Sequence, residues 1–180
     1  MQNYTLSILV ENASGVLSQV TRLFSRKGYN INSLAVGKTH DPEISRITVI
    51  VPGDELMVKL LTTQLNKMLC VLSVQVLSDG KSVERELILI KVKAADRTVR
   101  DEIIQIVNIF RANIIDIGLE SLTISQVGDL EKTDAMLNLM EQFGILETVR
   151  TGMIALERGA NSIYDRNKDK EEYNYGKNVL

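Results

Sequence analysis

Hydrophobic and polar residues alternate over residues 4–10, YTLSILV, a pattern typical of a strand. The pattern then changes to helical spacing and stops before Gly28, with apolar residues along one stripe: Val16, Leu17, Val20, Leu23 and Phe24. Two more strands are predicted over residues 31–38 and 45–53. A second helix is predicted after Asp54, its N-cap, and a fourth strand over residues 71–77. The first half of the chain therefore has the predicted order β-α-β-β-α-β.

After a polar joint at residues 78–85, the same order is predicted a second time. Strands are expected over residues 86–94, 113–119, 121–127 and 145–156, and helices over residues 98–110 and 130–143. Single positions also match: Phe24 and Phe110 stand six residues before Asn30 and Asp116, and a Gly-Asp pair opens the second helix of both halves. The repeat predicts an α+β protein of two tandem ferredoxin-like (βαββαβ) domains, with antiparallel sheets and helices on one face.

The predicted domains cover residues 1–78 and 85–159, with a linker at 79–84. A polar, flexible tail is expected at 160–180, where Tyr164, Tyr173 and Tyr175 could contact a partner. The second face of the first sheet is expected to stay open and to hold apolar residues such as Leu9 and Ile50. Small domains usually cover such a face with another domain or chain. The pattern therefore predicts a homodimer.

Composition excludes several classes of function. The chain has 180 residues, a net charge of −2, one His and one Cys. It therefore lacks a basic field for nucleic acid, and one chain cannot assemble a Cys/His zinc site or a Ser–His–Asp triad in its usual form. We find no apolar run near the roughly 18 residues that cross a bilayer, no signal peptide, and no dinucleotide or phosphate-loop fingerprint. We expect a cytoplasmic protein that is not an enzyme and has no cofactor and no membrane partner.

The loop of residues 11–15, ENASG, holds the strongest candidate binding site. It leads from the first strand into the first helix, whose unpaired N–H groups and positive end favour a carboxylate or another small anion. Gly15 leaves room for a ligand, and the Asn12 amide can both donate and accept, which suits a zwitterion. Asn30 of a dimer mate could complete the pocket. The alternative interpretation is a helix-capping turn built from ordinary turn residues.

A comparison between the halves favours a ligand. The corresponding loop of the second half, residues 94–99 (AADRTV), begins a helix without a Gly or an Asn. Any ligand site should therefore lie in the first half only. Other candidates are weaker: His40 with Asp41 and Glu43 could bind a metal, although a single His in a loop is more often simply exposed. Cys70 is expected to be a buried structural thiol.

Several strings of the sequence resemble those of a known family. The strings LVENASGVLSQVTRLFSRKGYNINSLAVGKTHDPEISRITV, VERELILIKV, IFRANIIDI and GMIALERG are similar to the small regulatory subunit of acetolactate (acetohydroxyacid) synthase. The likeness runs over about residues 6–159. It implies an N-terminal ACT domain, a C-terminal ferredoxin-like domain and a homodimer. It also implies binding and activation of the large catalytic subunit, with feedback inhibition by valine in branched-chain amino acid biosynthesis.

By this resemblance, the effector-binding residues lie in the first loop and on the strand facing it across the ACT dimer: Asn12, Gly15, Val16 and Leu17, with Asn30 and Ile31. The carboxylate of valine is expected at the backbone N–H groups near residues 15–17. Thiamine diphosphate, FAD and magnesium are expected on the catalytic subunit and not on this chain.

Three other functions stay open at this point. A free-standing ACT-domain sensor would bind another amino acid and would not bind the synthase. An RNA-binding module of the same strand order would need exposed aromatic residues on its central strands and a basic surface, and the sequence predicts neither. An acylphosphatase-like enzyme would need an Arg in the loop of residues 11–15, which has none.

Overall fold

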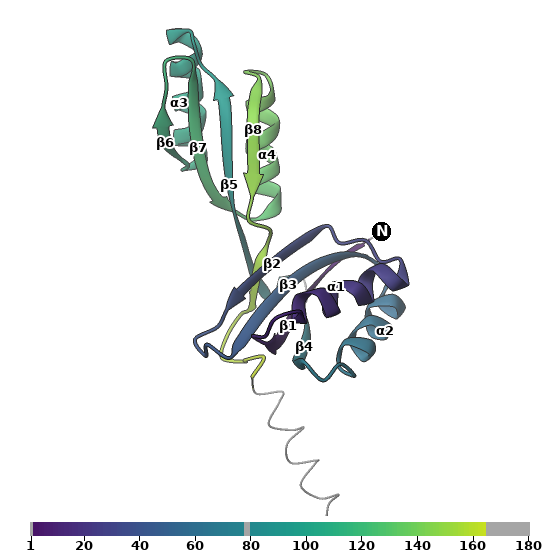
Figure 1. Ribbon diagram of the computed structural model, residues 1–180. Helices are drawn as coiled ribbons and strands as arrows, with labels where there is room; N and C mark the ends of the chain where they lie inside the picture. Colours follow the sequence, from purple (N-terminus) through teal and green to yellow (C-terminus); the bar gives the residue numbers. More distant parts are fainter. Residues whose placement is uncertain (1, 78–79, 165–180) are drawn as a thin grey trace, which may run out of the picture. The chain divides into compact units, whose positions relative to one another are not determined.

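The computed structural model describes residues 2–77 and 80–164 of the chain (Figure 1). These residues belong to two compact units. Unit 1 contains the chain up to Val83 and the returning segment that begins at Ala155, and unit 2 contains Glu84–Ile154. The first unit therefore includes residues from both ends of the chain.

Unit 1 has the predicted β-α-β-β-α-β order. Its strands are β1 (Gln2–Glu11), β2 (Ser33–Lys38), β3 (Ile44–Gly53) and β4 (Val71–Leu77), and its helices are α1 (Val16–Lys27) and α2 (Glu55–Leu65). The strands pair antiparallel in the order β2-β3-β1-β4, so β2 and β4 form the edges of the sheet. The ferredoxin-like fold predicted for the first half is confirmed.

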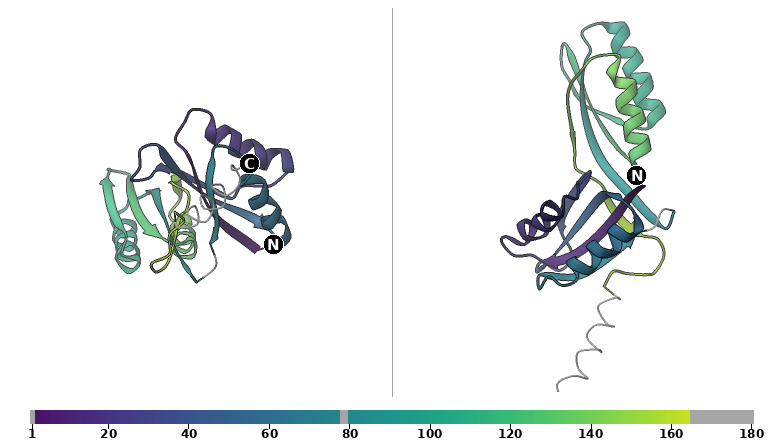
Figure 2. Two further views of the ribbon diagram at one scale, coloured as in Figure 1. Left: turned by 90° about the horizontal axis from the view of Figure 1, so that it is seen from below. Right: turned by 90° about the vertical axis from the view of Figure 1, so that its right-hand side faces the viewer.

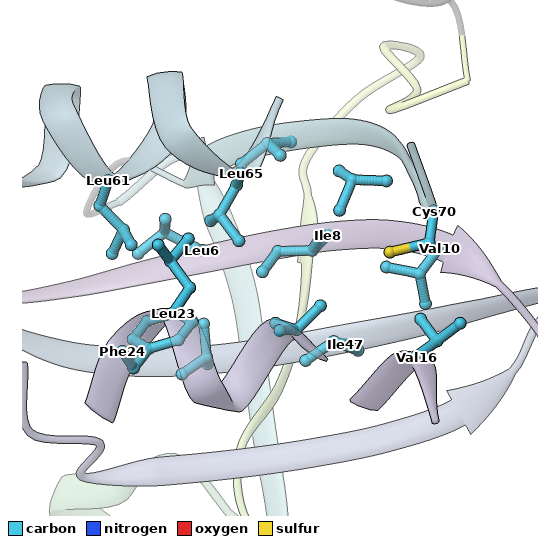
Figure 3. Close-up of a cluster of buried hydrophobic side chains, with 14 of the residues drawn as sticks. Leu6, Ile8, Val10, Val16, Leu23, Phe24, Ile47, Leu61, Leu65 and Cys70 are labelled. Atoms are coloured by element: carbon cyan, nitrogen blue, oxygen red, sulfur yellow. The ribbon is translucent and has the colours of Figure 1, made fainter. Parts of the chain in front are cut away.

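The core of unit 1 lies between its two helices and one face of the sheet (Figure 3). The alternate β1 residues Leu6, Ile8 and Val10 point toward the helices, and each is at most 2% exposed. They pack with apolar side chains of both helices, among them Phe24 and Leu61, each 1% exposed. Burial of one such side chain contributes about 1.5–3 kcal/mol. The alternation of apolar residues in β1 and the apolar stripe of α1 therefore explain why these side chains form the core of unit 1.

Unit 2 repeats the order around a core of its own. Its strands are β5 (Ser82–Lys93), β6 (Asn113–Ile117), β7 (Ser121–Gly128) and β8 (Ile145–Arg150), and its helices are α3 (Arg97–Phe110) and α4 (Leu130–Glu141). The sheet order β6-β7-β5-β8 corresponds to that of unit 1. α3 ends at Arg111 with a φ of 53°, where α1 ends at Gly28 with a φ of 68°. The repeat thus keeps the left-handed turn although the glycine is absent from the second half.

Several element boundaries differ from the sequence prediction. The strand expected from residue 86 begins at Ser82, within the expected polar joint. The strand expected over residues 145–156 is split into β8 and a short strand, β9 (Ile154–Glu157), which pairs with β5. Gly152, with a φ of 80°, lies in the break. The strand expected from residue 31 begins at Ser33 instead. There the side chains of Asn30 and Asn32 hydrogen-bond to each other, and such local polar contacts compete with a strand ladder.

The second face of the unit 1 sheet is not open. Leu9 on this face is 0% exposed and Ile50 is 6% exposed. Residues 155–164 of the same unit, which we call the strap, lie against this face (yellow in Figures 1 and 2). The expectation of an open apolar face that needs another chain is therefore wrong, because this chain returns to cover it. That face gives no support to a homodimer.

The strap includes the first part of the predicted polar tail. Residues 160–164 are described, and the Tyr164 ring meets the His40 ring edge-on with centroids 5.4 Å apart. The tail prediction for residues 165–180, with Tyr173 and Tyr175, lies outside the described residues. The strap and residues 80–83 both belong to the unit formed by the first half of the chain.

Candidate functional site

The N-terminus of α1 is open and lacks a side-chain cap. Gly15 occupies the cap position in the left-handed region, with a φ of 85°, and no side chain accepts a hydrogen bond from the first turn. Val16 N donates to Ala13 O at 3.3 Å, and Gln19 N donates to Gly15 O at 3.0 Å. Within residues 2–77 and 80–164, the N–H groups of Leu17 and Ser18 have no acceptor. The helix start therefore offers two free donors and the positive end of its dipole.

In each of the other three described helices, an Asp side chain caps the N-terminus. Asp54 accepts from Met57 N at 2.7 Å, Asp96 from Thr98 N at 2.9 Å, and Asp129 from Lys132 N at 3.0 Å. Asp96 begins the helix that corresponds to α1 in the second half. The two corresponding loops therefore differ in how they begin their helices. The difference consists of a carboxylate cap in one unit and an uncapped glycine in the other.

Asn12 does not cap α1. Its Nδ2 donates to Pro42 O at 2.7 Å, its backbone N donates to Glu43 O at 2.7 Å, and its Oδ1 accepts from Ser45 Oγ at 3.1 Å. These contacts hold the loop of residues 11–15 against the turn between β2 and β3. The amide still has one N–H and one acceptor position for a ligand. A capping turn alone thus does not explain Asn12.

Gly15 is required by its backbone angle and not by crowding within the unit. An added Cβ at this position would meet no atom within 4 Å. The space beside the loop is therefore open, whereas a side chain at a φ of 85° would be strained. Val16 next to it is 5% exposed and belongs to the core, so only its backbone can face a ligand. Leu17 is 40% exposed and keeps part of its side chain at the surface.

Asn30 and Ile31 lie at the opposite end of the unit. Asn30 is exposed, and its Nδ2 donates to Asn32 Oδ1 at 2.9 Å, while Ile31 packs against the core. Asn32 in turn donates to Asn3 Oδ1 at 3.1 Å, near the first residues of β1. Asn12 follows the last residue of β1, and α1, with its 12 residues, spans about 18 Å between the two places. One copy of unit 1 therefore does not bring Asn12 and Asn30 together.

Two of the three candidate metal ligands at residues 40–43 have side-chain contacts of another kind. Asp41 Oδ1 accepts from Glu43 N at 2.9 Å within the turn, and His40 contacts Tyr164. Among residues 2–77 and 80–164, no group of three or more His, Cys, Asp or Glu side chains is placed to hold a metal ion. Cys70 is buried, and its Sγ lies 3.8 Å from Gln19 Oε1.

Arg46 is a polar residue that the sequence interpretation missed. It lies on the strap side of β3, and its Nη2 donates to Ala155 O at 3.0 Å. Burial lowers the pKa of its guanidinium, an effect that the nearby Tyr164 phenol partly offsets. A charged residue beside the apolar Ile47 is one signal in the sequence that this face is not a simple apolar surface.

The fold of two ferredoxin-like units, the first with an uncapped glycine loop at its first helix, fits the class of ACT-domain proteins. Two family models match the chain. One is described as AHAS small subunit-like ACT domain and covers residues 6–73, and the other is described as small subunit of acetolactate synthase and covers residues 85–159.

Relatives and a solved structure extend this match over most of the chain. The acetolactate synthase small subunit of Mycolicibacterium smegmatis is 45% identical over 160 residues, 89% of this chain and 94% of the relative. The probable small subunit of Methanothermobacter thermautotrophicus is 43% identical over 160 residues, 89% of this chain and 95% of the relative. A crystal structure of the small subunit from Thermotoga maritima has a TM-score of 0.83 at 36% identity, covering 89% of this chain and 100% of that one. The chain belongs to the acetolactate synthase small subunit family.

Over the residues that the structure describes, no helix combines the length and the apolar character needed to cross a membrane.

Proposed function

We propose that this chain is the regulatory subunit that binds the large catalytic subunit of acetolactate synthase, raises its activity and makes it sensitive to inhibition by valine. Membership of the small subunit family supports the choice of partner. The uncapped start of α1, with free N–H groups at Leu17 and Ser18, is the observation that supports an effector with a carboxylate.

The valine pocket is proposed to form between two copies of the chain. β2 is an edge strand, and a second β2 can pair with it antiparallel about a two-fold axis. Such pairing sets the start of β2 in one copy beside its end in the other. Asn30 and Ile31 precede the start, and Asn12 holds the turn that follows the end. The residues that lie apart in one copy would therefore be neighbours in the dimer.

Each part of valine has a proposed contact in this pocket. The carboxylate accepts from the free N–H groups at the start of α1, where the helix dipole also favours negative charge. The ammonium group donates to amide and backbone oxygens, including Asn12 Oδ1. The isopropyl group lies on the exposed part of Leu17 and on Ile31 of the other copy. A zwitterion with a small branched side chain can make all three contacts: with the N–H donors, with the oxygen acceptors and with the apolar side chains.

The chemistry of the synthase is proposed to reside on the partner. We place thiamine diphosphate, FAD and magnesium on the catalytic subunit, as membership of the small subunit family implies. This chain then acts without catalysis of its own, by favouring one conformation of the catalytic subunit. A single Cys is consistent with the reducing cytoplasm as the site of action.

Mixed dimers test whether the pocket spans two copies. Gly15→Asp and Asn30→Ala each remove one wall of every pocket in their own homodimers, so neither homodimer should bind valine well by isothermal titration. A mixed dimer has one pocket with both changes and one with none. It should therefore regain about one high-affinity site per dimer, as complementation across a two-fold interface requires. No recovery in the mixed dimer would place the pocket within one copy.

A further inference from the structure

The strap covers a polar face of the unit 1 sheet. Strand pairing arranges this face as three rows across β3, β1 and β4: Arg46–Leu9–Ser73, Thr48–Ser7–Gln75 and Ile50–Thr5–Leu77. Five of these nine residues are polar and buried: Thr5, Ser7, Thr48, Ser73 and Gln75. A sheet with one solvated face normally carries such polar residues on its water side. The pattern is that of an exposed face, yet the face is covered.

Hydrogen bonds from this face and from residues 81–93 hold the strap. Its first residues belong to β9, which pairs with β5, and Arg158 donates to Lys81 O at 2.7 Å and to Ser82 O at 3.0 Å. Arg46 Nη2 donates to Ala155 O at 3.0 Å, and Ser73 Oγ donates to Ile163 O at 3.3 Å. Gln75 Nε2 donates to Glu157 Oε2 in the middle row. Ala155, at the start of the strap, is therefore bound to β3, and Ile163, near its end, is bound to β4. Both bonds come from the row Arg46–Leu9–Ser73.

Two polar atoms on this face lack hydrogen-bond partners in the described part of the chain although they are buried. Ser7 Oγ and Arg46 Nε are buried without a hydrogen-bond partner among the described residues. Such groups lower the stability of the closed arrangement, because water would bind them if the strap left. Only two apolar side chains of the strap, Ala155 and Ile163, are buried. A segment seated on few apolar contacts and over unsatisfied polar groups opens more readily than a core element.

A continuous set of contacts joins the strap to the loop of residues 11–15. Asn12 binds Pro42 O and Glu43 O, which fixes the turn between β2 and β3. His40 in the same turn packs edge-on against Tyr164 at the end of the strap. The start of the strap continues directly through Ile154 into unit 2. The loop at α1 and the strap therefore share one turn, and the strap leads to the rest of the chain.

We propose that the strap is a movable element whose closure on the ACT sheet is controlled by the loop of residues 11–15 through the turn of residues 39–43. A ligand that orders the loop holds Asn12 on the turn, and the turn then presents His40 to Tyr164 and favours the closed strap. This inference rests on the proposed function only for the identity of the ligand, valine. The contact between loop and strap exists without it.

Hydrogen exchange measured by mass spectrometry on the full chain tests this coupling. Without ligand, Tyr164→Ala and Asn12→Ala should each speed exchange in peptides of residues 155–164 by about threefold to tenfold, in the range of couplings between protein sites. Tyr164→Phe is the matched control, because it keeps the ring that meets His40 and should stay within about twofold of wild type. The double variant Asn12→Ala/Tyr164→Ala should exchange no faster than the faster single variant, since both changes break one connection.

Two results of this cycle would overturn the coupling. One is unchanged strap exchange in Asn12→Ala, and the other is a double variant in which the two effects multiply. Peptides of β7 in unit 2 serve as an internal reference, and unchanged exchange there shows that neither variant has simply loosened the whole chain.

Adding valine separates this inference from the proposed function. In wild type, saturating valine should slow strap exchange by about threefold or more. In Tyr164→Ala, valine should still bind with a Kd within about threefold of wild type, yet leave strap exchange unchanged. Valine that binds wild type without slowing the strap overturns the coupling and leaves the proposed function intact. Absence of valine binding in wild type refutes the effector, while the Asn12–Tyr164 cycle still decides the coupling.

Discussion

Replacing Gly15 by Asp tests whether a carboxylate binds at the start of α1, and Gly15→Asn is its matched control. Both side chains have nearly the same size, and both tolerate the left-handed backbone better than other non-glycine residues do. An added Cβ meets no atom within 4 Å, so neither variant creates a clash within the unit. The two variants therefore differ mainly in one negative charge.

The size of the effect follows from the position of that charge. Two unit charges about 4 Å apart repel by about 1 kcal/mol in water and about 4 kcal/mol at an effective dielectric constant of 20. Gly15 lies in an exposed loop, so we expect the lower part of this range. A penalty of about 1–2 kcal/mol corresponds to valine binding about fivefold to thirtyfold weaker in Gly15→Asp than in Gly15→Asn.

The same charge should act in the opposite direction on folding. A carboxylate near a helix N-terminus stabilises the helix by about 0.3–1 kcal/mol. Gly15→Asp should therefore unfold at a slightly higher urea concentration than Gly15→Asn, although it binds valine more weakly. In 1 M salt, where the Debye length is about 3 Å, the difference in valine affinity should shrink.

Isothermal titration and urea unfolding on the two purified variants measure these quantities. Equal loss of valine affinity in both would mean that loop geometry, and not charge, governs binding. Wild-type affinity in Gly15→Asp would refute the placement of the valine carboxylate at α1.

Three further substitutions test the fold and the proposed dimer. Phe24→Ala removes a side chain that is 1% exposed and should lower the free energy of urea unfolding by about 3–5 kcal/mol; a loss below about 1 kcal/mol would contradict the described core. Thr133→Val removes the hydroxyl that donates to buried Glu86 Oε1 at 2.5 Å and should cost about 1.5–3 kcal/mol in the same assay, whereas Thr133→Ser should retain most of the stability. Val36→Lys on edge strand β2 places like charges near the two-fold axis and should weaken dimer formation in sedimentation velocity by about tenfold; Leu69→Lys, at a site 98% exposed, is the control, and equal effects would argue against pairing through β2.

Periodicity was enough to predict most of the fold. Alternation in β1 and the apolar stripe of α1 each place one set of side chains in a single core, so local pattern and tertiary packing agree there. The repeat of this pattern in the second half likewise predicted the order of elements in unit 2. The pattern failed at Gly152, because apolar residues alternate on both sides of the break and conceal where β8 ends.

The candidate site was predicted less completely because its contacts are long-range. The sequence comparison showed only that the loop of residues 94–99 lacks the Gly and the Asn. The Asp96 cap and the uncapped Gly15 come from the structure. The bonds from Asn12 to Pro42 and Glu43 join residues about thirty positions apart, and no spacing rule predicts them. Such contacts depend on the pairing of β1 with β3 and become visible only in the folded unit.

The strap escaped prediction for a related reason. Ser7 and Gln75 alternate with apolar residues, and this pattern indicates a side that faces water. Residues more than eighty positions later cover them, as the bond from Gln75 to Glu157 shows. The strap is short and mostly polar, so it has no apolar periodicity from which its packing on the sheet could be predicted. The open face was therefore assigned incorrectly from the sequence pattern.

Titration of the purified large subunit of acetolactate synthase with this chain tests the proposed regulatory role most directly. Acetolactate formation should rise with added chain until the subunits are saturated, and valine should then lower it. With Gly15→Asp in place of wild type, the activation should persist and the response to valine should be lost or much weakened. A large subunit whose activity is unchanged by this chain, or whose activation persists at every valine concentration with the wild-type chain, would contradict the proposed function.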